Sequence, residues 1–186
     1  TQLGTMGRMR IASWLACPAP RPHADTALVC FPHAGAGTMA FAAWGRRLYP
    51  ALELHIASLP GRGRRLREPA ERNMETIVSA LCAEIVRLRH QRVVFFGHSL
   101  GALVAYEVTR ALRRKGAVRP SHLVVSSRGA PTVTDSRPPL HTLSDDAFIA
   151  GMSTRYGGIP AALLQNPELL AIFIPALRAD MALHAT

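Results

Sequence analysis

Apolar residues along this chain occur in two patterns, short continuous runs and runs with helical spacing. The continuous runs predict four strands, at 28–31, 52–59, 93–96 and 122–126. The run at 93–96 contains no polar residue, which is typical of a strand covered on both faces. A shorter apolar run at 11–17 follows two arginines, but two prolines come directly after it. It predicts a short strand rather than a signal peptide.

Apolar positions with helical spacing alternate with these strands. They predict amphipathic helices at 77–88, with Asn73 as a plausible N-cap, and at 100–115, with Gly116 as the C-terminal cap. Strands that alternate with helices predict a parallel sheet whose ligands bind beyond the carboxyl ends of the strands. Function is therefore expected in four loops, those that follow Phe31, Leu59, Phe96 and Ser126.

After residue 139 the pattern is helical only. Ser144 is a favourable N-cap for one helix, which Gly157 ends. Asn166 and Pro167 begin another helix, and Pro175 is expected to kink it. A helical pair after a sheet strand suits either a lid over a pocket or an ordinary packing layer, and the pattern alone favours neither.

Length and composition predict a single globular domain over residues 1–186. Hydrophobic residues make up 48% of the chain and charged residues 18%, and no apolar stretch approaches the length of a membrane span. Cys17, Cys30 and Cys82 are odd in number and form no C-x-x-C, so neither a disulfide framework nor a cysteine zinc site is expected. A reducing, cytoplasmic location follows. The first residue is Thr1 and the helical pattern continues to the last, so we expect the ends to be boundaries within a longer polypeptide.

The chain carries 22 basic and 12 acidic residues, a formal net charge of +10. This excess suits an acidic partner or a merely solvated surface. Four arginines follow the second predicted strand closely, at positions 62, 64, 65 and 67, without the interleaved aromatic residues typical of nucleic-acid binding. A nucleic acid is therefore not expected as a partner.

Gly97-His98-Ser99-Leu100-Gly101 matches the G-x-S-x-G pattern of a nucleophile elbow. The match is informative because it lies between the predicted strand at 93–96 and the helix that begins at Leu100, the strand-turn-helix context that an elbow needs. Ser99 is predicted to be the catalytic nucleophile, with Gly97 and Gly101 allowing strand and helix to pass closely; a tight structural turn is the alternative.

An elbow of this kind needs two backbone N–H groups as an oxyanion hole. Leu100, the residue after the nucleophile, is predicted to supply one. The small residues of the loop at 31–37 let the backbone approach a substrate, and Ala34 is predicted to supply the other.

Four ordered motifs resemble those of the type II thioesterases, stand-alone α/β-hydrolases that accompany polyketide synthases and non-ribosomal peptide synthetases in antibiotic biosynthesis. The segments are Phe-Pro-His-Ala-Gly at 31–35, Leu-Pro-Gly-Arg at 59–62 with Arg-Glu-Pro at 67–69, Gly-His-Ser-Leu-Gly-Ala at 97–102 and Pro-Ala-Leu-Arg-Ala-Asp at 175–180. Ala36 departs from the glycine usual in the family. The resemblance implies an α/β-hydrolase fold with a mostly parallel sheet, flanking helices and a helical lid at about 140–184.

The same resemblance implies hydrolysis of acyl thioesters on phosphopantetheinyl carrier proteins, in an editing role that clears stalled acyl groups. The implied partners are acyl or peptidyl carrier proteins, which are generally acidic, and small acyl groups. It implies a monomer without a membrane partner, a metal ion or a cofactor beyond the arm of the carrier.

A serine nucleophile needs a histidine base and an acid, which follow the serine in α/β-hydrolases. We expect both beyond residue 186, so that the domain lacks its last strands; a remnant that only binds carrier protein or acyl groups is the alternative. His98 is expected to pack beside Ser99, and His33 to shape its loop. His184 suits a local pair with Asp180 rather than a role as base. The other histidines are interpreted as surface or satisfied residues: His23, His55, His90, His122 and His141.

Overall fold

The computed structural model describes residues 13–48, 50–117, 119–133 and 137–184. Its centre is a five-stranded sheet in the order β1-β3-β2-β4-β5, in which only β1 runs antiparallel to its neighbour. The strands are β1 (Leu15–Ala16), β2 (Thr26–Phe31), β3 (Leu52–Ala57), β4 (Arg92–His98) and β5 (His122–Ser126). The predicted α/β class with a mostly parallel sheet is confirmed. Part of the short strand predicted at 11–17 lies outside the described residues.

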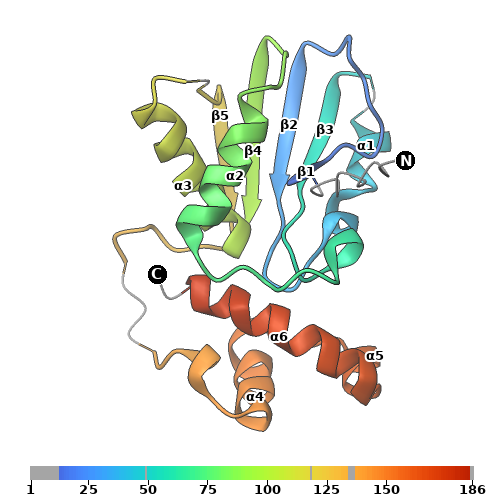
Figure 1. Ribbon diagram of the computed structural model, residues 1–186, viewed down its shortest axis with the longest axis vertical. Helices are drawn as coiled ribbons and strands as arrows, with labels where there is room; N and C mark the ends of the chain where they lie inside the picture. The colour runs from blue at the N-terminus through green and yellow to red at the C-terminus, as the bar shows by residue number, and fades with distance from the viewer. Residues whose placement is uncertain (1–12, 49, 118, 134–136, 185–186) are drawn as a thin grey trace, which may run out of the picture.

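Helices cover both faces of the sheet (Figure 1). On one face, α2 (Met74–Ile85) and α3 (Leu100–Arg114) enclose the main core with alternate side chains of β2 and β4, such as Phe31 and Phe95. On the other face lie the 3-10 turn η1 (Thr38–Phe41) and α1 (Trp44–Arg47). The even residues of β2 and β3 face this layer, because side chains alternate along a strand.

Two of the predicted helix caps form hydrogen bonds and one does not. The side chain of Asn73 accepts from the backbone N–H groups of Glu75 and Thr76, and that of Asn166 accepts from Leu169. Ser144 occupies the N-cap position of its helix, but its hydroxyl makes no capping hydrogen bond. The predicted N-cap position of Ser144 is therefore confirmed, and the two aspartates of the first turn add the favourable charge.

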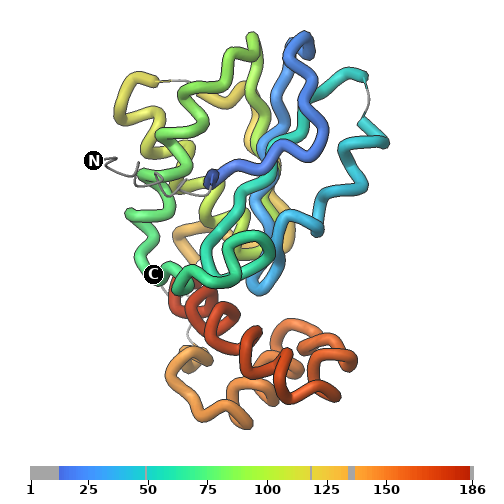
Figure 2. The backbone as a smooth tube through the Cα atoms, turned by 45° about the vertical axis from the view of Figure 1, so that its right-hand side comes forward, coloured from blue at the N-terminus to red at the C-terminus, as the bar shows by residue number. Residues whose placement is uncertain are grey.

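Residues 140–184 form a separate helical layer below the carboxyl ends of the strands (Figures 1 and 2). It contains the 3-10 turn η3 (Leu140–Thr142), α4 (Asp145–Tyr156), α5 (Ala161–Leu164) and α6 (Pro167–His184), which continues through Pro175. A small apolar core that includes Phe148, Met152 and Leu177 holds the layer together. None of the helices in the described part of the chain combines the length and hydropathy needed to cross a membrane.

A buried ion pair ties this helical layer to the sheet. The guanidinium of Arg62, in the loop after β3, donates to both carboxylate oxygens of Asp180 on α6, at 2.5 and 2.8 Å. The Asp180 carboxylate is fully buried and also accepts from the backbone N–H of Gly35, in the loop after β2, at 2.7 Å. These three residues, here called the clamp, join two sheet loops to α6. Charged groups tolerate such burial only when they are paired and hydrogen-bonded.

Replacing Asp180 by alanine is expected to lower the free energy of unfolding by about 3–5 kcal/mol, because it leaves the Arg62 charge buried without its partner. The matched control is Asp145→Ala, which removes a carboxylate paired with Arg178 but 74% exposed, and should cost less than about 1 kcal/mol. Urea unfolding followed by circular dichroism measures both. Equal losses for the two variants would show that the clamp contributes no more than a surface pair.

Candidate active site

Ser99 lies at the sharp turn between β4, which ends at His98, and α3, which begins at Leu100. Its backbone has φ 53° and ψ −115°, a conformation that residues other than glycine rarely adopt. The turn is fixed on both sides, since the Ser99 N–H donates to the carbonyl of Ser126 at 2.8 Å and its carbonyl accepts from the Ala102 N–H at 3.0 Å. The sequence thus places a serine in the strained turn that a nucleophile elbow requires.

The two glycines of the motif are required by close backbone packing. A Cβ at Gly97 would lie 2.4 Å from the Gly101 carbonyl oxygen, and one at Gly101 would lie 1.9 Å from the carbonyl oxygen of Phe31. No side chain fits at such distances without moving backbone. The contact at Gly101 also sets the first turn of α3 against the loop that follows β2.

The backbone groups predicted as an oxyanion hole lie on these two neighbouring segments. Leu100 is the first residue of α3, where N–H groups have no acceptor within the helix and the helix dipole is positive. Ala34 lies in the loop after β2 and packs against both the main core and the helical layer. The neighbouring N–H of Gly35 is already bonded to Asp180. The assignment of Leu100 and Ala34 stays a prediction.

Two histidines lie beside each other at this edge of the sheet. The rings of His33 and His98 are T-shaped with centroids 5.6 Å apart, and His98 Nδ1 lies 3.1 Å from the Ser126 hydroxyl. Desolvation and the neighbouring His98 lower the pKa of His33, whereas Asp180 acts in the opposite direction. Among the histidines that the structure describes, none is hydrogen-bonded to the Ser99 hydroxyl.

The two residues predicted as a local pair on the last helix have other partners. Asp180 is bonded to the clamp residue Arg62, whereas His184 contacts the guanidinium of Arg128 at 2.9 Å and the ring of Tyr156. Arg128 lies in the loop after β5 and also donates to the His184 carbonyl. The end of α6 is thereby attached to the sheet.

The clamp is the feature of this site that sequence reasoning missed. Arg62 and Asp180 each close one of the motifs that carried the family resemblance, and they are 118 positions apart. The sequence did show an arginine and an aspartate of opposite charge in two of these motifs. It could not show that they pair with each other, because the chain carries many other arginines with which Asp180 could have paired.

The described residues include one group with the spacing of metal ligands, Cys17 with Glu53 and His55. It lies along β3 and just after β1, away from the elbow.

Comparison with known proteins agrees with this geometry. The model of the thioesterase domain family matches residues 26–186. Thioesterase PikA5 of Streptomyces venezuelae is 38% identical over 168 residues, which cover 90% of this chain and 59% of PikA5. The solved structure of the RedJ thioesterase from the prodiginine pathway of Streptomyces coelicolor has a TM-score of 0.79 and 41% identity, and the match covers 91% of this chain and 64% of RedJ.

The type II thioesterase BorB of the borrelidin cluster also has a TM-score of 0.79, with 29% identity over 95% of this chain and 72% of BorB. This chain therefore spans about three fifths to two thirds of PikA5 and RedJ. The resemblance to type II thioesterases is confirmed. The chain belongs to the thioesterase domain family.

Proposed function

We propose that this chain carries the nucleophile of an enzyme that hydrolyses acyl thioesters on phosphopantetheinyl carrier proteins and clears stalled acyl groups from a biosynthetic assembly line. The observation that carries the proposal is the conformation of Ser99. Ser99 has φ 53° and ψ −115° and lies between two glycines that admit no side chain, and strained backbone of this kind clusters at active sites.

In the proposed reaction the Ser99 hydroxyl loses its proton to a base and its oxygen attacks the thioester carbonyl. The N–H groups of Leu100 and Ala34 stabilise the oxyanion that forms. The carbon–sulfur bond then breaks, and the thiol of the carrier arm leaves with the proton from the base. Water, deprotonated by the same base, then attacks the acyl ester on Ser99. The bond between the acyl carbon and the Ser99 oxygen breaks, the base returns its proton to that oxygen, and the free acid is released.

We propose that the base and its acid belong to a region that follows this segment in the complete domain. The exposed edge of the sheet supports this. Val124 and Val125 point to opposite faces of β5, yet they are 47% and 53% exposed, whereas both faces of a parallel strand are normally covered. The match covers only 59% of PikA5 and 64% of RedJ, so both relatives contain residues that have no counterpart in this chain.

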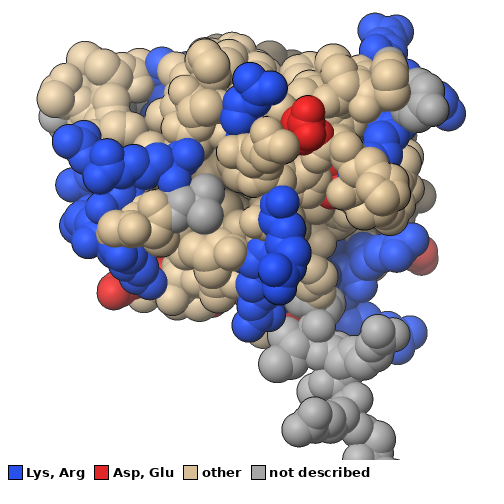
Figure 3. All heavy atoms as spheres, turned by 90° about the horizontal axis from the view of Figure 1, so that it is seen from above, with Lys and Arg blue, Asp and Glu red and all other residues tan. Residues whose placement is uncertain are grey.

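The basic residues of the chain fall into two groups, those exposed on the surface and those buried in specific contacts. Seen from the end opposite the helical layer, basic side chains are spread widely with few acidic ones among them (Figure 3). In the loop after β3, Arg65 is buried against Glu68 and the Trp14 ring, and Arg62 belongs to the clamp. Arg64 and Arg67 are exposed, and we propose that these two attract an acidic carrier protein.

The proposed setting is a monomer in the cytoplasm. Within the described residues the three cysteines are free thiols, which is compatible with a reducing compartment.

Labelling with a fluorophosphonate tests the nucleophile. The protein is a chimaera in which the residues after His184 come from the RedJ thioesterase, so that a full-length domain is present. One adduct per chain is expected, and none in Ser99→Ala, because only an activated serine attacks phosphorus. Ser126→Ala, next to the elbow on β5, should be labelled normally. A folded chimaera without label, or with equal label in Ser99→Ala, would contradict the assignment.

Turnover tests whether the base and acid belong to the following region, and whether the second candidate, a remnant that binds carriers without hydrolysis, can be eliminated. No histidine among the described residues bonds to Ser99, so the 186-residue chain should hydrolyse an acyl carrier protein at least about 10⁴-fold more slowly than the chimaera. Binding by the two proteins should agree within about tenfold. Efficient hydrolysis by the 186 residues would eliminate the remnant, and a folded chimaera without turnover would refute the thioesterase proposal.

Charge reversal tests the docking surface. Arg64→Glu with Arg67→Glu should weaken carrier binding about tenfold at low salt, and the difference should shrink in 1 M salt, where the Debye length is about 3 Å. The matched control reverses Arg113 and Arg114, two exposed arginines at the far end of α3. Calorimetric titration measures the affinities. A binding constant that salt leaves unchanged, or equal losses for both double variants, would argue against steering by this loop.

A further inference from the structure

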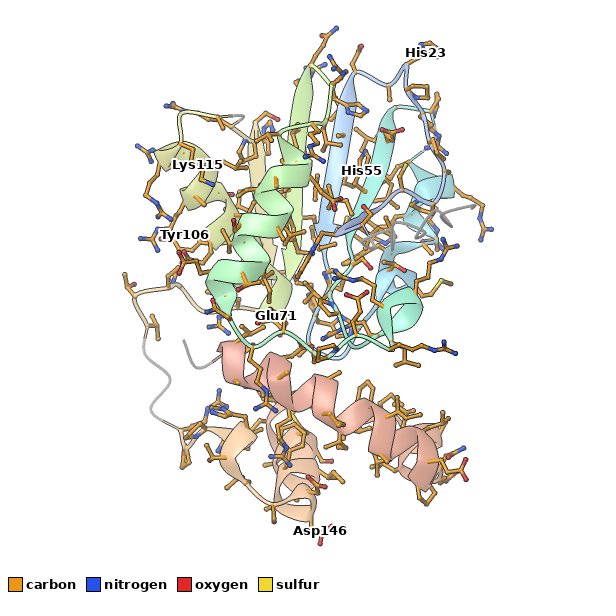
Figure 4. The ribbon with its side chains drawn as sticks, viewed as in Figure 1. His23, His55, Glu71, Tyr106, Lys115 and Asp146 are labelled. Atoms are coloured by element: carbon orange, nitrogen blue, oxygen red, sulfur yellow. The ribbon has the colours of Figure 1, made fainter. Side chains whose placement is uncertain are left out.

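Four side chains with metal-binding atoms meet at the end of β3 that lies away from the elbow. Glu53 and His55 project from the same face of β3, since they are two residues apart on one strand. Cys17 directly follows β1, which pairs with β3, and His90 lies in the turn between α2 and β4. Figure 4 labels His55 on β3 near the middle of the sheet, with the helical layer below the sheet. We propose that Cys17, Glu53, His55 and His90 form a binding site for a zinc ion.

The distances between these side chains suit a shared ion. The ligand atoms of Cys17, Glu53 and His55 lie within 4.8 Å of one another. Glu53 Oε2 is 2.9 Å from Nε2 of both His55 and His90, and the two imidazole rings are 5.8 Å apart. Zinc bonds of about 2.0 Å to nitrogen or oxygen and 2.3 Å to sulfur separate tetrahedral ligands by about 3.3–3.8 Å. Side-chain shifts of about 1 Å would therefore bring Cys17, Glu53 and His55 to these spacings. His90 lies outside that group of three, although it contacts Glu53, so its ring would have to move further to become the fourth ligand.

If the cluster were held together only by hydrogen bonds, the burial of the His90 ring would have no explanation. Its side chain is only 8% exposed, and within the described residues neither ring nitrogen has a hydrogen-bond partner of adequate geometry. Nε2 lies close to the Glu53 carboxylate without being aligned for donation. Buried polar atoms are almost always satisfied, so an imidazole that touches the Glu53 carboxylate and leaves Nδ1 without a partner among the described residues, in a cluster with a thiol and a second imidazole, points to a ligand.

The charges of the cluster balance a divalent ion. Burial, followed by the effect of Glu53, raises the pKa of Cys17 to about 11, so the thiol is protonated when no ion is bound. Burial would raise the pKa of Glu53, but hydrogen bonds from the Arg21 N–H and His55 outweigh it and lower the pKa. Burial lowers the pKa of His55.

Zinc binding would release the Cys17 proton to solvent and form one zinc–sulfur bond. Thiolate and carboxylate charges together then cancel the charge of the ion. A set of one sulfur, two nitrogens and one carboxylate oxygen favours zinc over magnesium or calcium, which prefer oxygen ligands alone.

Such a site would stabilise the fold and would take no part in the proposed hydrolysis. It would join the segment after β1 to β3 and to the turn before β4, and so fasten the short edge strand. The expectation of no cysteine zinc site rested on the spacing of cysteines alone. Residues 17, 53, 55 and 90 form no local pattern, because the strand order brings them together. The proposal does not depend on the proposed function.

Metal titration of the 186-residue chain, stripped with a chelator and free of any affinity tag, tests the site. Zinc chloride is expected to bind with one equivalent and to raise Tm by about 5–10 °C at a hundredfold excess over Kd. Cobalt chloride should give the thiolate charge-transfer band and the intense visible bands of a four-coordinate ion. Absence of zinc binding by the folded chain would overturn the proposal.

Variants locate the ion. Cys17→Ser and His90→Gln should each weaken zinc binding by more than about 100-fold, since even partners outside the coordination shell contribute 10–100-fold. Cys17→Ser should also abolish the charge-transfer band. The matched control is His122→Gln, an exposed histidine on β5 at the opposite edge of the sheet, which should bind as wild type.

Wild-type affinity in both Cys17→Ser and His90→Gln would place the ion elsewhere and leave this cluster as a hydrogen-bonded core. If Cys17→Ser does not fold, the cobalt spectrum of the wild type and the zinc affinity of His90→Gln decide whether the ion binds at this cluster. A cobalt complex without a thiolate band would exclude Cys17 as a ligand and overturn the site.

Discussion

The buried pair between Arg62 and Asp180 is the contact on which the arrangement of the sheet edge around Ser99 depends. It connects the loop after β3 with α6, and through the Gly35 N–H it also fixes the loop after β2. Neither charge would be stable at this depth alone, because desolvation costs several kcal/mol per ion. The position of the Arg62 side chain therefore determines the position of Asp180, and the reverse. The clamp therefore fixes the two sheet loops relative to the helical layer, which is also joined to the main core through the buried side chain of Leu183.

The same loop after β2 meets the elbow directly. Gly101 touches the Phe31 carbonyl so closely that no side chain fits, and the strained backbone of Ser99 is fixed by hydrogen bonds to Ser126 and Ala102. Strain of this kind persists only where surrounding contacts determine the conformation. The clamp and the elbow thus fix the same loop. The clamp holds the loop after β2 through Gly35, and the close packing at Gly101 sets that loop against the first turn of α3.

The two ends of β3 differ in chemistry. At the carboxyl end the Arg62 loop supplies the clamp and two exposed arginines. Further back along the strand, Glu53 and His55 form a buried polar cluster with residues from two other segments. Polar groups inside a small domain need specific partners, and the cluster has them for the carboxylate but not for His90. An ion would satisfy that ring and fasten an edge strand held by only two paired residues.

The sequence by itself determined the strands, the order of the elements and the elbow, because these depend on local periodicity and on the spacing within one turn. It also located Asn73 and Asn166 as caps, since a cap bonds within three residues. It could not foresee that the Ser144 hydroxyl stays unused, or that Asp180 bonds to Arg62 and Gly35. Nor could it bring Cys17 and His90 to Glu53. Those contacts join residues 36 to 145 positions apart, and only the crossing of strands and the docking of α6 decided which opposite charges and which ligand atoms would meet.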